Sequence, residues 1–157
     1  ESITNYANDT RKEGQAEVEF EIAKPPPGMD RARAYTVMGH DSRLGQVVRN
    51  LIDNAINYTP SSQDAPGVIT ARVLADRFGQ VAVFQVEDSG PGIPESERDL
   101  VFQPFYRALG NEADGSGLGL PIVLEIARQH RASVTLSDSR PGHMPPGACF
   151  TVRFDTA

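Results

Sequence analysis

The chain has 157 residues, of which 39% are hydrophobic, and its formal net charge is −6. This length fits one domain, and the negative charge argues against an electrostatic grip on nucleic acid or on an anionic membrane. No apolar run approaches the ~18 residues that span a bilayer, and no signal peptide is recognisable. The single Cys149 has no partner for an internal disulfide, which fits a reducing compartment. Because the chain begins with Glu1 rather than Met, we expect a fragment of a longer protein.

The first part of the chain predicts a lead-in segment followed by a strand. Residues 1–15 are expected to be a helix or linker, with helical spacing over 2–13, ahead of one domain over 16–157. From residue 16 to 23 hydrophobic residues alternate with glutamates, which is the pattern of a strand with one buried face. A proline-rich loop comes next, and a second strand is expected over 34–38.

The clearest helical pattern covers residues 41–58. Its expected core stripe consists of Leu44, Val47, Val48, Leu51 and Ala55. The remaining expected elements are strands over 68–75 and 80–88 with a hairpin turn at 76–79, a helix over 119–130, and strands over 132–138 and 148–154.

These elements predict an α+β fold, a two-layer sandwich in which helices pack on one face of a mixed, mainly antiparallel sheet. The opposite face is expected to meet solvent or a partner. Residues 89–117 contain five glycines, three prolines and no long periodic run. Such a loop inside a compact domain is typical of a lid or a binding loop, and we expect the lid at about residues 95–115.

The helix over 41–58 carries polar residues along one side. Asn50 and Asn54 are one turn apart, and Asn57 and Tyr58 follow on the next turn. Asn is a poor helix former, so three in eight residues suggest a use, and amide oxygens can complete the coordination of Mg²⁺ on a nucleotide. On spacing alone, a solvated polar flank explains them equally well.

Two glycine-rich blocks follow this helix: Asp88-Ser-Gly-Pro-Gly-Ile-Pro and Gly115-Ser-Gly-Leu-Gly-Leu. A carboxylate at the end of an apolar strand is costly unless it is paired, and the second block leads into a helix, whose N-terminal N–H groups bind anions. A plain turn and a flexible linker are the alternatives. Between the blocks lies an aromatic cluster, Phe102, Phe105 and Tyr106, followed by Arg107.

In this order, within about seventy residues, the motifs resemble the ATP-binding catalytic domain of bacterial two-component sensor histidine kinases. These belong to the GHKL superfamily, with gyrase B, Hsp90 and MutL, and share the Bergerat ATP-binding fold. The resemblance covers roughly residues 16–154 and implies ATP and Mg²⁺ as cofactors. It implies that Asp88 accepts a hydrogen bond from adenine, that Asn54 and Asn50 face Mg²⁺, and that Asn50 and Arg107 serve catalysis. The nucleotide-binding residues it implies are Asn50, Asn54, Asn57, Tyr58, Asp88, Gly90, Gly92, Ile93, Phe105, Arg107, Gly115, Ser116, Gly117, Leu118, Gly119 and Leu120.

Two positions bear on the choice within the superfamily. Hydrolytic relatives have Glu at the Asn50 position, and an amide cannot take a proton from water, which favours transfer over hydrolysis. The aromatic cluster resembles the one that anchors the lid in histidine kinases and contacts their phosphoacceptor domain. Many kinases carry Lys or Arg at the Asn57 position, so Arg107 is expected to take more of the cationic role. Arg131 is a departure too, since many members have Gly or Ala there.

The resemblance implies donation of the γ-phosphate to a histidine on a separate dimerisation and phosphoacceptor domain, and then to the receiver domain of a response regulator. His40, His130 and His143 lie in no phosphoacceptor context. The isolated chain is expected to be a monomer, and the whole protein a homodimer and an inner-membrane sensor of which this is a cytoplasmic domain. Nucleic acid is not an expected partner. The alternatives are a hydrolysing ATPase of the gyrase, Hsp90 or MutL type and a non-catalytic nucleotide-binding module.

Overall fold

The computed structural model describes residues 17–22, 41–75, 80–106 and 118–155. The elements are β1 (Glu17–Ile22), α3 (Asp41–Tyr58), β2 (Val68–Ala75), β3 (Val81–Asp88), the 3₁₀ turns η1 (Glu95–Glu97) and η2 (Leu100–Phe102), α4 (Gly119–Gln129), β4 (Ser133–Asp138) and β5 (Ala148–Asp155). Each predicted bound of these strands and long helices is correct to within one residue. The helix expected over 2–13, the strand over 34–38 and the turn at 76–79 lie outside the described residues.

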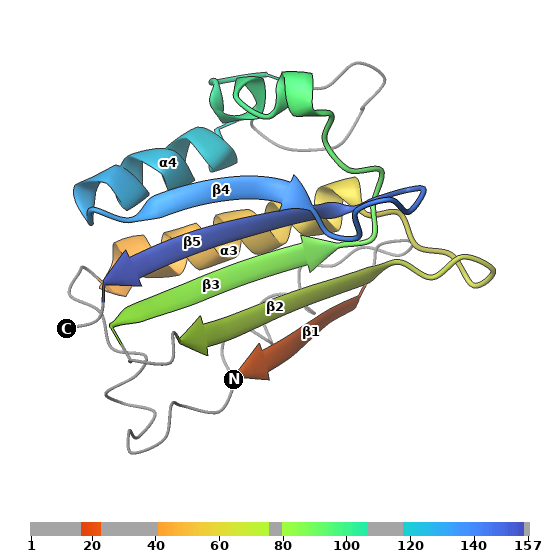
Figure 1. Cartoon of the computed structure of the whole chain (residues 1–157), viewed down its shortest axis with the longest axis horizontal. Coiled ribbons are helices and arrows are strands. Elements are labelled where there is room, and N and C mark those ends of the chain that lie inside the picture. The colour runs from red at the N-terminus through yellow and green to blue at the C-terminus, as the bar shows by residue number, and fades with distance from the viewer. Residues whose placement is uncertain (1–16, 23–40, 76–79, 107–117, 156–157) are drawn as a thin grey trace.

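The strands form one sheet in the order β1-β2-β3-β5-β4. β1 runs parallel to β2, and the other three pairings are antiparallel. α3 and α4 both lie on the same face of this sheet (Figure 1). The predicted α+β class, with helices on one face of a mixed, mainly antiparallel sheet, is therefore confirmed.

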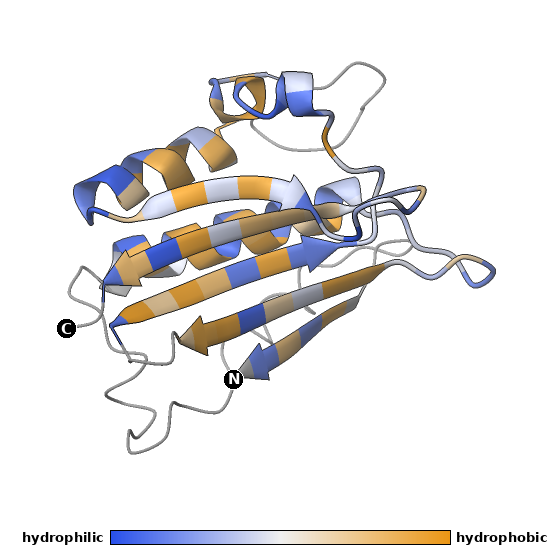
Figure 2. Ribbon diagram, in the orientation of Figure 1, coloured by the Kyte–Doolittle hydropathy of each residue, from blue (hydrophilic) through white to orange (hydrophobic). Residues whose placement is uncertain are grey.

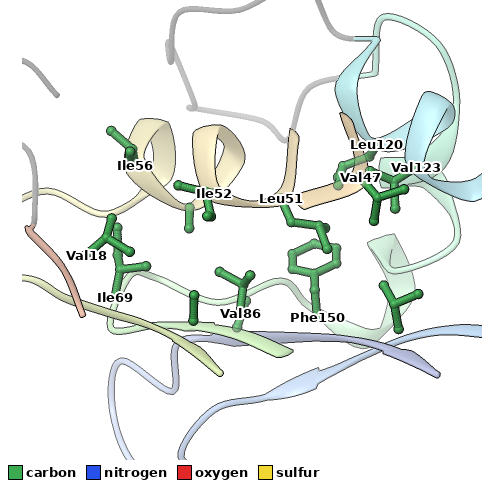
Figure 3. Close-up of a cluster of buried hydrophobic side chains, with 14 of the residues drawn as sticks. Val18, Val47, Leu51, Ile52, Ile56, Ile69, Val86, Leu120, Val123 and Phe150 are labelled. Atoms are coloured by element: carbon green, nitrogen blue, oxygen red, sulfur yellow. The ribbon is translucent and has the colours of Figure 1, made fainter. Parts of the chain in front are cut away.

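The hydrophobic core lies between α3 and the sheet (Figure 3), where Leu51 faces the ring of Phe150. The predicted stripe of α3 was too narrow, because Ile52 and Ile56 are also buried, with 0% and 4% of their surfaces exposed. α3 packs against both the sheet and α4, so its buried face is wider than that of a helix lying on one surface. Fully burying a Leu or Ile side chain contributes roughly 1.5–3 kcal/mol, so these contacts fix α3 firmly in place.

The opposite face of the sheet is largely polar. Hydrophilic and hydrophobic residues alternate along the strands (Figure 2), and Glu19 and Glu21 are exposed as expected. The guanidinium of Arg72 on β2 reaches Glu21 on β1 at 3.2 Å and Glu87 on β3 at 2.6 Å. These ion pairs link the outer face of three neighbouring strands. Within the described residues no helix has the length and apolarity needed to cross a membrane.

The end of α4 shows why many family members have glycine where this chain has Arg131. The N–H of Ala132 donates to the carbonyl of Ala127 at 2.8 Å, and that of Arg131 donates to the carbonyl of Arg128 at 3.2 Å. This pair of bonds is a Schellman motif, whose residue after the cap adopts a left-handed conformation. Arg131 has a φ of 53°, which glycine would adopt without strain.

Candidate functional site

Two side-chain hydrogen bonds show that α3 and α4 run antiparallel. Near the start of α3, Arg43 Nη1 donates to Gln129 Oε1 at the end of α4, at 3.1 Å. In the middle of α3, Asn50 Nδ2 donates to the carbonyl of Gly119, the first residue of α4, at 3.3 Å. The second half of α3 therefore continues past the N-terminus of α4.

The far end of α3 meets the turn that follows β3. A Cβ atom added to Gly90 would lie only 2.6 Å from the carbonyl oxygen of Tyr58, the last residue of α3. Glycine is needed there because the two backbones touch. Asn50 and Tyr58 are eight residues apart on α3, which is about 12 Å along a helix. The first glycine block thus lies at one end of this stretch, and Gly119 of the second lies at the other.

Asp88 is held at the edge of the core by two backbone donors. It is 6% exposed, and its Oδ1 accepts hydrogen bonds from the N–H groups of Gly90 at 2.9 Å and Ala148 at 3.1 Å. Burial raises its pKa to about 6, and the two backbone hydrogen bonds oppose the rise. Oδ2 has no hydrogen-bond partner among the described residues. Asp88 is therefore ionised at neutral pH and keeps one acceptor oxygen for another group.

The connection between β4 and β5 closes against this turn. Gly147 has a φ of 68°, and its N–H donates to the carbonyl of Gly90 at 3.1 Å. A Cβ on Gly147 would lie 2.0 Å from the carbonyl oxygen of Asp88, and one on Gly92 would lie 2.8 Å from the Pro146 ring. Sequence reasoning missed Gly147. A glycine between a proline pair and a strand was the available signal.

Thr59, directly after α3, was also missed. It is 1% exposed, and its hydroxyl has no hydrogen-bond partner among the described residues. The hydroxyl oxygen would lie 3.4 Å from a Cβ on Gly90, and Asp88 Oδ1 would lie 3.1 Å from the same point. Buried polar groups are nearly always hydrogen-bonded, so this hydroxyl is available to a ligand bound next to Asp88, which the periodicity of α3 could not indicate.

The amide of Asn50 has a defined orientation. A backbone carbonyl only accepts hydrogen bonds, so the nitrogen must face Gly119 and Oδ1 is left as an acceptor or a metal ligand. Asn54, Asn57 and Tyr58 are half-buried farther along α3. No group of three or more His, Cys, Asp or Glu side chains suited to a metal occurs in the part of the chain that the structure describes. Amide oxygens together with ligand phosphates remain the donor set that fits Mg²⁺ here.

The second glycine block ends at the N-terminus of α4. Leu118 is its N-cap residue without a side-chain cap, and its carbonyl accepts from the N–H of Ile122 at 3.1 Å. The N–H groups at the start of α4 have no partners within the helix, which favours an anion there. The Leu120 side chain is core, so only its backbone can serve a ligand. Gly115, Ser116, Gly117 and the predicted catalytic Arg107 lie outside the described residues.

The aromatic residues between the two glycine blocks, Phe102, Phe105 and Tyr106, have different surroundings. Phe102, in η2, packs its ring edge-to-face on Phe150 of the core, with the ring centroids 6.2 Å apart. Phe105 is 71% exposed and has a φ of 63°, which is uncommon for a residue with a side chain. The hydroxyl of Tyr106 donates to Glu97 in η1. The described part of the lid is thus attached to the domain through Phe102 and presents Phe105 to solvent.

Comparison with known proteins identifies the family of the chain. Residues 39–157 match the family described as histidine kinase-, DNA gyrase B- and HSP90-like ATPases. Among solved structures, the mycobacterial sensor histidine kinase MprB aligns over 98% of this chain and 93% of its own, with 28% identity and a TM-score of 0.74. Full-length ShkA, solved in complex with AMPPNP, aligns over 99% of this chain and 29% of its own, with 25% identity and a TM-score of 0.72.

The most similar curated relatives that we compared are also histidine kinases. The signal transduction histidine-protein kinase/phosphatase MprB of Mycobacterium sp. (strain KMS) is 40% identical over 119 residues, which is 75% of this chain and 22% of the relative. MprB of Mycobacterium tuberculosis (strain ATCC 25177 / H37Ra) is 38% identical over 119 residues, or 75% of this chain and 23% of the relative. The chain belongs to the histidine kinase-, gyrase B- and HSP90-like ATPase family, as the ATP-binding catalytic domain of a bacterial histidine kinase. It spans about a fifth of the length of these curated relatives.

Proposed function

We propose that the domain binds Mg·ATP along α3 and presents the γ-phosphate to a histidine of a separate dimerisation and phosphoacceptor domain. One observation carries this proposal: α3 connects an anion-favouring helix N-terminus, beside Asn50, to a buried carboxylate, beside Tyr58 and Gly90. An extended nucleoside triphosphate has a comparable length. Its base would then lie at Asp88 and its phosphates at the start of α4.

Each end of the site suits its part of the nucleotide. The free oxygen of Asp88 can accept the adenine amino group, whereas a guanine carbonyl would meet a like-charged acceptor. Gly90 and Gly92 let the turn after Asp88 pack directly against Tyr58 and Pro146, which fixes the turn beside the proposed base position. At the other end Asn50 offers Oδ1, and Asn54 lies one turn farther along the same helix. Mg²⁺ held there with the phosphates would neutralise charge on the phosphoryl group.

The residues also favour transfer over hydrolysis. Asn50 keeps its amide nitrogen on Gly119 and offers no group that could take a proton from a water molecule. Arg107 remains the proposed cation for the transferring phosphate, and Phe105, exposed on the lid, is the proposed contact to the phosphoacceptor domain. We further propose a receiver-domain aspartate as the final acceptor, a homodimeric inner-membrane parent protein with this domain in the cytoplasm, and a monomeric isolated chain.

The decisive experiment combines binding with transfer. The chain should bind ATP more tightly with Mg²⁺ than without it, and Asn54→Ala should lose this gain while binding metal-free ADP normally. With γ-labelled ATP the chain alone should acquire no acid-labile phosphate, but it should label the histidine of an added phosphoacceptor domain from a related kinase. Rapid phosphate release without such an acceptor would instead establish the hydrolysing ATPase. Absence of nucleotide binding would leave only a signalling module.

A further inference from the structure

One arginine in the lid reaches back to the base-binding end of the site. Arg98 follows η1 directly, and its Nε donates to the carbonyl of Ile93 at 3.3 Å. Its Nη2 forms an ion pair with Asp138 Oδ1, at the end of β4, at 3.0 Å. The two side chains are 27% and 33% exposed, so the pair is partly shielded from water, where attraction between charges is stronger than on an open surface.

Asp138 is linked to Asp88 through the sheet. It lies directly opposite Ala148 in the β4–β5 ladder, and the N–H of Ala148 is one of the two donors to Asp88 Oδ1. The next residue, Ser139, donates its hydroxyl to Glu87, the neighbour of Asp88, at 3.2 Å. A displacement at the end of β4 would therefore move the donor that orients the Asp88 carboxylate.

Ile93 supplies the second connection. It closes the turn that begins at Asp88, and its side chain packs against the core cluster. Because Arg98 binds the carbonyl of Ile93 and the carboxylate of Asp138 at once, it joins the lid, the turn and the end of β4. Ile93 is one of the expected nucleotide-binding residues, and Arg98 holds it through its backbone carbonyl, whereas Asp138 is not in that set.

We propose that Arg98 is a positioning residue that preorganises the base-binding end of the site from the lid. The inference rests on the proposed nucleotide site. Without Arg98 the turn and the β4–β5 end would sample more arrangements, and nucleotide binding would have to order them at the expense of affinity. Chemistry at the γ-phosphate, which we place beside Asn50 and the start of α4, would be unaffected once ATP is bound.

Calorimetry with ADP tests this directly. Arg98→Ala and Asp138→Asn should each weaken ADP binding by about threefold to thirtyfold. The double variant should lose little more than either single one, because both remove the same link. Arg98→Lys should fall between wild type and Arg98→Ala, since it keeps a cation for Asp138 but has no Nε donor for Ile93. Arg43→Ala is the matched control, an arginine with one hydrogen bond at the far end of the helix pair, and should bind ADP as wild type does.

A kinetic readout separates positioning from general destabilisation and from direct phosphate contact. With an added phosphoacceptor domain, and below the unfolding temperature of every variant, Arg98→Ala should raise the KM for ATP and leave kcat unchanged. Unchanged ADP affinity in both Arg98→Ala and Asp138→Asn, additive losses in the double variant, or a lower kcat at saturating ATP would overturn the positioning role. Failure of the wild-type chain to bind ADP would instead refute the nucleotide site itself.

Discussion

Replacing Asp88 with Asn should make the domain more stable and its nucleotide site weaker. The ionised carboxylate is 6% exposed, and burial raises its pKa from 3.8 to about 6. A group with a raised carboxyl pKa binds its proton more tightly in the folded state, so stability falls as pH rises from about 4 to about 6. The difference between the two pKa values corresponds to about 3 kcal/mol.

Asn at this position keeps an oxygen that can accept from Gly90 and Ala148, and it carries no charge to desolvate. Asp88→Asn should therefore raise the free energy of unfolding at pH 7 by about 1–3 kcal/mol. It also replaces the free acceptor oxygen with a donor, which should weaken ADP binding about ten- to a hundredfold, the equivalent of about 1.5–3 kcal/mol.

Urea unfolding of wild type and Asp88→Asn at several pH values between 4 and 7 measures the first effect, and calorimetry with ADP at pH 7 measures the second. The stability difference should be near zero at pH 4 and grow up to about pH 6, the pKa of Asp88. A stability difference that does not change with pH, or a variant less stable than wild type at pH 7, would refute the desolvation argument. Unchanged ADP affinity would refute the assignment of the base to Asp88.

Two further predictions concern backbone conformation. Gly147→Ala should lower the free energy of unfolding by more than about 3 kcal/mol and abolish ADP binding, because its Cβ would lie 2.0 Å from the Asp88 carbonyl oxygen. Gly142→Ala, with a similar φ of 82° but nothing within 4 Å of its added Cβ, should cost only about 1–2 kcal/mol in the same urea titration. Arg131→Gly should raise the melting temperature by a few degrees, from about 1 kcal/mol of relieved strain. Arg131→Ala, which keeps the left-handed strain, should show no such rise.

Local patterns in the sequence predicted the elements well because each element buries one face, and the burial sets the period of its hydrophobic residues. The alternation around Val18 and the helical spacing from Val47 to Ala55 express burial on one face, and the structure follows both. The insertion of β5 between β3 and β4 was not predicted. The pairing of β5 with β3 joins residues 62 to 74 positions apart in sequence, and no local hydrophobic period reports such a contact.

The same distinction applies to the site. The sequence singled out Asn50, Asp88 and Gly90 because their residue types are unusual at that spacing. The structure places Asn50 at one end of the segment of α3 between Asn50 and Tyr58, and Asp88 and Gly90 at the other. The sequence did not single out Gly147 and Arg98, because a glycine in a turn and an arginine in a loop are common. Only the backbone that lies against them distinguishes these two residues. Their roles come from tertiary contacts alone.

The interior position of β5 sets the order in which the site can assemble during synthesis on the ribosome. Among the strands that the structure describes, β5 comes last in sequence, yet it pairs between β3 and β4. Its first residue supplies a donor to Asp88, and Gly147, just before it, seals the turn. A nascent chain lacking β5 would carry both helices but no finished base site. With the base bound at Asp88 as proposed, nucleotide would stabilise the domain by mass action only after β5 has paired.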